Sequence, residues 1–327
     1  MFAYRLIIKQ ALEIAWRHRY LWIFGLFASI VAASGSFEYQ LLTGSFQTSI
    51  LDNSYYYLNV LLSSLEALGL FILGFIDLFS YNILTIINTL TVLIIVTALI
   101  GSFLWFSISS QGALVEASKR IITSKKKISN LNLRQLLTIG HQNFWPVLGL
   151  NVLIKLAIIV ILSIISIPLL ILAAKYSTYL TLIYTLAFII FVPLAIACSL
   201  MIKYAIAYKV IDDEDFFSAL KKSWHMFRKN WLVSLEMGII LFLISFLVGF
   251  ILIIALSVIV LPYFIFAIDY GIAWLIILIA IVTLFLVLAV GSFLTTFQIG
   301  AWTNIFLELK AGNGQAKLER IFRKKSK

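Results

Sequence analysis

The stretch FFSALKKSWHMFRKNWLVSLEMGIILFL (216–243) joins two kinds of helix without a loop between them. Over residues 216–231, apolar and polar side chains recur with a period of about 3.6 residues, the pattern of an amphipathic helix. From Trp231 onward almost every residue is apolar, as in a helix that crosses a bilayer. The sequence therefore predicts a basic helix at the membrane surface that leads directly into a membrane span.

The overall composition also indicates a membrane protein. Of the 327 residues, 62% are hydrophobic and 12% are charged, whereas a soluble domain has about 45–50% apolar and about 25% charged residues. The single cysteine, Cys198, excludes an intramolecular disulfide. No nucleotide-binding loop, zinc-protease motif or serine-hydrolase motif occurs. We therefore expect no enzymatic activity, no catalytic residues and no cofactor.

Six apolar stretches meet or approach the length of about 20 residues that a helix needs to cross the hydrocarbon core. They predict an all-α, polytopic membrane helix bundle that forms a single domain over residues 1–327. The first stretch is short and could instead be a signal peptide, because VAASG (31–35) offers small residues for cleavage. The long amphipathic segment before it favours a retained span. The stretches are 20–34, 88–110, 146–174, 179–202, 231–261 and 272–306.

The positions of the basic residues predict the orientation. All but two of the 25 Lys and Arg residues lie before the first span, after spans two and four, or after span six; the exceptions are Lys155 and Lys175. The positive-inside rule then places both termini in the cytoplasm. The net charge of +11 is explained by contact with anionic headgroups of the inner leaflet, so we expect no nucleic-acid partner.

The outer side of the predicted bundle carries one long polar and aromatic insertion, at about residues 37–85. Within it, residues 61–79 place apolar side chains at helical spacing around Glu66 and Asp77. We expect this segment to form a helix that lies on the outer interface or re-enters the membrane.

Three segments of the chain share one pattern. Each begins as an amphipathic helix, passes through a short polar junction that contains histidine, and continues through aromatic residues into a span. The segments are ALEIAWRHRYLWIFGL (11–26), LRQLLTIGHQNFWPVLGL (133–150) and ALKKSWHMFRKNWLVSL (219–235). Two of the returning spans also match, since SSQGALVE (109–116) is similar to TFQIGAWTNIFLE (296–308).

The repeat predicts three pseudo-repeated hairpins, each preceded by a basic amphipathic interfacial helix. The expected units are about 1–120, 129–211 and 212–312, followed by a basic cytoplasmic tail over 313–327.

The aromatic and basic junctions resemble those of a six-helix membrane domain attached to some bacterial glycerophosphodiester phosphodiesterases, and of related uncharacterised six-helix membrane families of bacteria and archaea. The resemblance implies a six-helix layout in a prokaryotic cell membrane. The soluble phosphodiesterase domain has no counterpart in this chain, so the resemblance implies no catalytic site.

Two predicted spans contain a charged residue. Lys155 and Glu236 lie on the first spans of neighbouring hairpins, and such charges usually seek a partner. They are candidates for a charged pair that lines a cavity, although each could instead reach toward the headgroups. Gln111 and Gln298 each precede a nearby glycine, and are candidates either to line a polar path or to join helices by hydrogen bonds.

Four cations of the 216–231 helix, Lys221, Lys222, Arg228 and Lys229, are predicted to face anionic lipid of the inner leaflet. The three histidines, one at each junction, differ in register, and no Cys or carboxylate recurs beside them. We therefore predict no metal site. The histidines are His18, His141 and His225.

The sequence favours a non-enzymatic membrane protein that organises lipids or a membrane-protein partner through its basic helices. The alternative is a small transporter or permease subunit with a substrate path at the repeat interfaces. The chain lacks helices broken by Gly and Pro at matching repeat positions, which would indicate a transport site.

Overall fold

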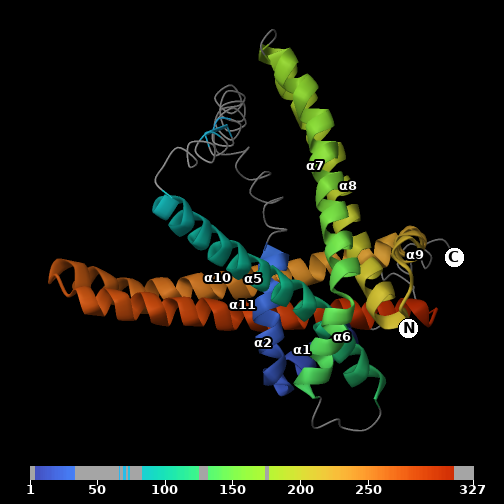
Figure 1. Cartoon of the computed structure of the whole chain (residues 1–327). Helices are drawn as coiled ribbons and strands as arrows, with labels where there is room; N and C mark the ends of the chain where they lie inside the picture. The colour runs from blue at the N-terminus through green and yellow to red at the C-terminus, as the bar shows by residue number, and fades with distance from the viewer. Residues whose placement is uncertain are drawn as a thin grey trace. The chain divides into compact units, whose positions relative to one another are not determined.

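The computed structural model describes residues 4–33, 66, 69–70, 73, 83–124, 132–173 and 177–312, with all of their side chains except those of 30–33, 158–159, 161–192 and 195. This part of the chain contains nine α-helices and one short 3₁₀-helix (Figure 1). The prediction of an all-α protein is confirmed for these residues. The predicted tail over 313–327 lies outside them, as does most of the outer insertion.

The helices divide between two compact units. The first unit comprises Met1–Ala32, Phe106–Ile154 and Cys198–Lys327, and the second comprises Ala33–Trp105 and Lys155–Ala197. The three junctions between amphipathic and apolar helices all belong to the first unit. The prediction of one domain with three repeat units is not tested by this division and stays a prediction.

Three amphipathic helices form where the sequence predicts them: α1 (Tyr4–Arg17), α6 (Leu133–Gln142) and α9 (Phe216–Lys229). Each is followed directly by an apolar helix. The 3₁₀-helix η1 (Arg19–Leu21) lies between α1 and its apolar helix. A single residue separates each of the other two amphipathic helices from its apolar helix. These apolar helices are α2 (Trp22–Ala33), α7 (Phe144–Ala173) and α10 (Trp231–Asp269).

Three helices in the described part of the chain are long and apolar enough to cross a membrane: α5 (Ile83–Thr123), α10 and α11 (Ala273–Lys310). They have 41, 39 and 38 residues, well beyond the about 20 that one crossing requires. Three such helices are typical of a multi-pass membrane protein. Two further long helices are α7, with 30 residues, and α8 (Ser177–Asp212), with 36, so residues 179–202 are helical as predicted.

The long helices are exposed over one length and packed over the other. In α11, large apolar side chains from Trp274 to Leu288 are exposed, whereas the helix contributes buried residues from Ser292 to Leu309. In α5, burial likewise begins at Ser107. Exposed apolar lengths of this kind suit contact with lipid chains, and the packed lengths form the core of the first unit.

Helices α10 and α11 form an antiparallel hairpin and lie side by side (Figure 1). The turn depends on Gly271, whose φ of +65° is a conformation that costs glycine little. The Gly271 N–H donates to Ile268 O at 3.0 Å and the Ile272 N–H donates to Ala267 O at 2.8 Å. This pair of bonds is a Schellman motif, which ends α10 and satisfies its last carbonyls.

Two glycines allow helices of the first unit to cross closely. A Cβ on Gly25 of α2 would overlap the backbone of Ser292 in α11, and a Cβ on Gly140 of α6 would overlap that of Ser109 in α5. Such contacts bring backbones together without a side chain between them.

One core cluster of the first unit includes residues from α1, α8, α9, α10 and α11. It buries the apolar face of α1 against α11, where Ala11 approaches Gly300.

Candidate membrane-interface site

The most strongly basic exposed surface among the amphipathic helices belongs to α9. Its Ala219, Ser223 and Met226 are buried, so the face that a free amphipathic helix would lay on lipid is covered by protein. The four predicted lipid-facing cations on its other side are all exposed. They are Lys221, Lys222, Arg228 and Lys229.

An acidic segment before α9 pairs with cations of three helices. Asp212 accepts from Lys310 of α11 at 2.6 Å, and Asp213 pairs with Lys209 of α8 at 3.0 Å. Glu214 pairs with Lys222 and accepts a hydrogen bond from Ser218 at 2.7 Å. Bonds from Lys222 and Ser218 lower the pKa of the Glu214 carboxyl.

These ion pairs neutralise the charges of Lys209, Lys222 and Lys310. Within the described residues, Lys222 is the one member of the predicted lipid-facing set that has an acidic partner. Lys221, Arg228 and Lys229 therefore remain available to bind external anions.

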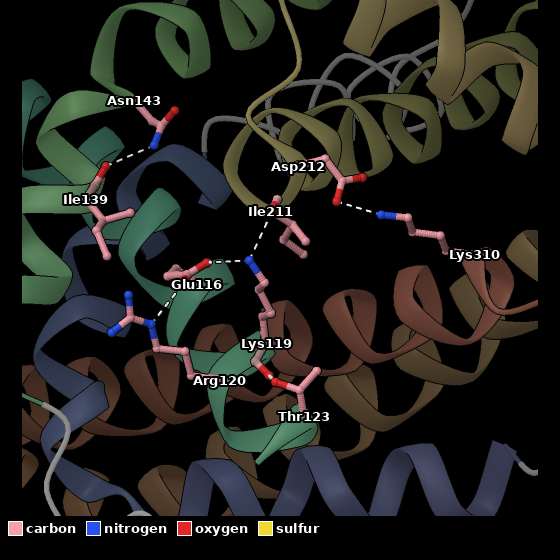
Figure 2. Close-up of polar contacts among 9 residues, drawn as sticks. All are labelled: Glu116, Lys119, Arg120, Thr123, Ile139, Asn143, Ile211, Asp212 and Lys310. Carbon is pink, nitrogen blue, oxygen red and sulfur yellow. Dashed lines mark hydrogen bonds and ion pairs between the residues drawn. The ribbon is translucent and has the colours of Figure 1, made fainter.

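A buried carboxylate in α5, Glu116, pairs with a lysine that also bonds to the C-terminal turn of α8 (Figure 2). Glu116 is 7% exposed and accepts from Arg120 Nε at 2.8 Å and from Lys119 Nζ at 3.4 Å. Lys119 also donates to the carbonyl of Ile211 at 3.0 Å, in the last turn of α8. Glu116 is not among the site residues predicted from the sequence, although a Glu three and four residues before Lys and Arg is a recognised helical pairing signal.

At two of the three junctions, an asparagine lies between the two helices and makes the same hydrogen bonds. Asn143 lies between α6 and α7 and donates through its side-chain amide to Ile139 O at 3.1 Å (Figure 2). Asn230 lies between α9 and α10 and donates to Met226 O, also at 3.1 Å. The backbone N–H of each asparagine donates to the same carbonyl as its side chain. The carbonyl of the asparagine itself accepts the first backbone hydrogen bond of the next helix. The asparagine at each of these two junctions is therefore hydrogen-bonded both to the amphipathic helix before it and to the apolar helix after it.

The first junction uses a histidine instead. His18 accepts the first bond of η1 from Leu21, and its Nδ1 contacts the Tyr20 hydroxyl at 3.1 Å. Burial, and to a smaller extent the charge of Arg17, lower the pKa of His18. Within the described residues there is no group of three or more His, Cys, Asp and Glu side chains that could hold a metal ion.

The predicted glutamines both bond across helices. Gln111 of α5 accepts from Asn151 of α7 at 3.0 Å, and Gln298 of α11 donates to Ser245 of α10 at 2.7 Å. These bonds are the kind expected of residues that join helices.

The predicted charged pair is not tested. Glu236 accepts a hydrogen bond from Tyr4 of α1. It belongs to the first unit, whereas Lys155 belongs to the second. The pairing of Lys155 with Glu236 therefore stays a prediction.

Exposed tryptophans mark all three junctions. Trp16 precedes η1, Trp145 lies in the first turn of α7, and Trp231 begins α10; all three are more than half exposed. Tryptophan is enriched where a bilayer meets water, because its ring is apolar and its N–H is polar. Together with the exposed cations of α9, these rings have the composition of a membrane-interface surface.

No protein-family model, curated protein or solved structure matches this chain.

Proposed function

We propose that this chain is a non-enzymatic, multi-pass cell-membrane protein that binds anionic lipid through basic interfacial helices and so organises lipids or a membrane-protein partner. The observation that carries the proposal is the arrangement of α9. Its buried face is fixed on the protein, while Lys221, Arg228 and Lys229 stay exposed. Each cation near an anionic surface contributes about 1 kcal/mol of binding free energy.

The proposed layout has six spans in three hairpins, with both termini in the cytoplasm of a prokaryotic cell. It is supported by the direct succession of amphipathic and apolar helices at three junctions and by the shared geometry of Asn143 and Asn230. The bias of Lys and Arg toward one side supports the orientation. This layout is the one implied by the resemblance to six-helix membrane domains.

Cysteine labelling tests the orientation. In a Cys198→Ala background, Ser45→Cys is expected to react with a membrane-impermeant thiol reagent only from outside the cell, because it falls in the predicted outer insertion. Ser326→Cys is expected to react only from the cytoplasmic side. Labelling of both positions from the same side would contradict the orientation.

Neutralising the basic face of α9 tests the function. The variant that combines Lys221→Gln, Lys222→Gln, Arg228→Gln and Lys229→Gln is expected to lose its preference for phosphatidylglycerol over phosphatidylcholine. The expected loss of binding free energy is up to about 4 kcal/mol, at about 1 kcal/mol for each cation. Native mass spectrometry of the detergent-purified protein, titrated with each lipid, measures the preference.

The control exchanges the same residues without a change of charge, as Lys221→Arg, Lys222→Arg, Arg228→Lys and Lys229→Arg. It is expected to keep the lipid preference, since the effect depends on positive charge. An unchanged preference in the neutralised variant would refute the proposed function.

The alternative function, a small transporter or permease subunit, has weaker support. In the described residues, Gln111 and Gln298 bond to side chains of neighbouring helices. The alternative keeps Lys155 and Glu236 as its candidate residues, since charges within spans often mark transport pathways.

A further inference from the structure

The side chains of α9 that lie away from its buried residues form two adjacent stripes of different chemistry, and all of them are exposed except Ser218, which is half-buried. Residues spaced at i, i+4, i+7 and i+11 lie along one face of an α-helix. The first stripe, called the aromatic–basic stripe, consists of Phe217, Lys221, Trp224 and Arg228. The second, called the polar stripe, consists of Ser218, Lys222, His225 and Lys229.

The aromatic–basic stripe exposes large apolar groups beside unpaired cations. Phe217 is 74% exposed and Trp224 is 53% exposed, which is costly in water for side chains of this size. Lys221 and Arg228 alternate with them and have no acidic partner among the described residues. Aromatic rings beside cations are typical of helices that lie at a bilayer interface. The ring then lies below the headgroups and the cation lies among them.

The polar stripe lacks large apolar groups, and its charge is partly neutralised. Glu214 lies four residues before Ser218, and it bonds to both Ser218 and Lys222. The Glu214 carboxylate therefore bonds to the polar stripe, whereas Asp212 and Asp213 pair with lysines of other helices. The two stripes differ in charge and in apolar content, although each contains two cations.

We propose that the aromatic–basic stripe is the lipid-binding edge of α9, and that the polar stripe faces the cytoplasm. Phe217 and Trp224 enter the boundary between headgroups and acyl chains of the inner leaflet. Lys221 and Arg228 bind the phosphates of anionic phospholipid. This inference rests on the proposed function, and it reduces the set of lipid-binding cations in α9 from four to two.

The position of α9 next to α10 favours a bilayer over a protein as the occupant. Only Asn230 separates the end of α9 from Trp231, which is exposed and begins an apolar helix that could cross the membrane. The stripe is therefore adjacent in the chain to a predicted span at its inner end. The stripe contains no acidic residue, which complements the negative charge of lipid phosphates.

Two matched double variants test the assignment. Lys221→Gln with Arg228→Gln removes two charges from the aromatic–basic stripe, and Lys222→Gln with Lys229→Gln removes two from the polar stripe. Phosphatidylglycerol binding by the detergent-purified protein is expected to fall about 25-fold in the first variant, from about fivefold for each cation. The second variant is expected to stay within about threefold of the parent.

The pattern of losses separates this inference from the proposed function. Equal losses in the two double variants, with complete loss in the fourfold variant, would overturn the stripe assignment and leave the proposed function standing. No loss in the fourfold variant would overturn both. Lys221→Arg with Arg228→Lys preserves charge and is expected to bind like the parent, which shows that a loss in the first double variant follows from charge.

Accessibility in a bilayer supplies a second test that does not depend on affinity. In a Cys198→Ala background, Phe217→Cys and Trp224→Cys are compared with the exposed His225→Cys in proteoliposomes that contain phosphatidylglycerol. The first two are expected to react at least about tenfold more slowly with a charged thiol reagent, because lipid shields them. Equal rates would overturn the proposal. So would protection that occurs only in native membranes, which would indicate a protein partner.

Discussion

Alanine at Gly140 or at Gly25 is expected to destabilise the protein by about 3 kcal/mol, at the upper end of the range for overpacking. A Cβ on Gly140 would lie 2.9 Å from the carbonyl carbon of Ser109 and would overlap the oxygen of that carbonyl. A Cβ on Gly25 would meet the carbonyl group of Ser292 in the same way. In both cases the obstacle is helix backbone, so the whole helix must move. Thermal unfolding in detergent, followed by tryptophan fluorescence, measures the loss.

Gly291 offers a matched control in α11, one residue before the Ser292 that limits Gly25. A Cβ there would meet no atom within 4 Å, and alanine stabilises a helix interior relative to glycine by about 0.5–1 kcal/mol. Gly291→Ala is therefore expected to leave the unfolding temperature unchanged or to raise it slightly. Equal losses for Gly25→Ala and Gly291→Ala would show that the close crossing of α2 and α11 is not formed.

The change Glu116→Gln is expected to destabilise the protein by about 2 kcal/mol, because it leaves Lys119 and Arg120 without their buried partner. Breaking a fully buried ion pair costs about 3–5 kcal/mol. The Lys119 and Arg120 side chains are 30% and 37% exposed, so solvent screening reduces the expected cost. Chemical or thermal denaturation of the detergent-purified variant measures this free energy.

Glu13 provides the control for burial. Its pair with Arg17 has the same spacing and the same distance of 2.8 Å as the pair of Glu116 with Arg120, but both side chains are more than half exposed. Exposed pairs of this kind contribute about 0.3–0.5 kcal/mol. Glu13→Gln is therefore expected to change stability very little. A loss as large as that of Glu116→Gln would mean that burial does not set the strength of these pairs.

Periodicity made the amphipathic helices predictable. The repeat of about 3.6 residues located α1, α6 and α9 closely, because a helix that buries one face must carry apolar residues on that face. The long apolar runs likewise located α10 and α11. The full length of α5 was less clear, since the predicted span 88–110 ends where small and polar residues continue the helix into the core.

Periodicity does not reveal what covers an apolar face. The sequence predicts that α1 is a basic amphipathic helix, but not that Ile7 and Ala11 on its apolar face pack in the protein core with residues of α11. The burial of Glu116 could not be predicted either, because the sequence pattern around Lys119 and Arg120 indicates only that these residues lie between two spans. Both features depend on contacts between distant segments, which local pattern does not specify.

The packing of α1 on α11 also constrains how the chain matures. Gln10 accepts a hydrogen bond from Asn304 across a separation of 294 residues, so the first and last described helices complete the same core. At about 5–20 residues per second, translation takes roughly 15–60 s to cover that distance. Throughout this interval α1 has emerged without the surface that will bury its apolar side chains. Because a basic amphipathic helix has affinity for a membrane surface, we expect the bilayer to cover the apolar side chains of α1 until α11 is complete.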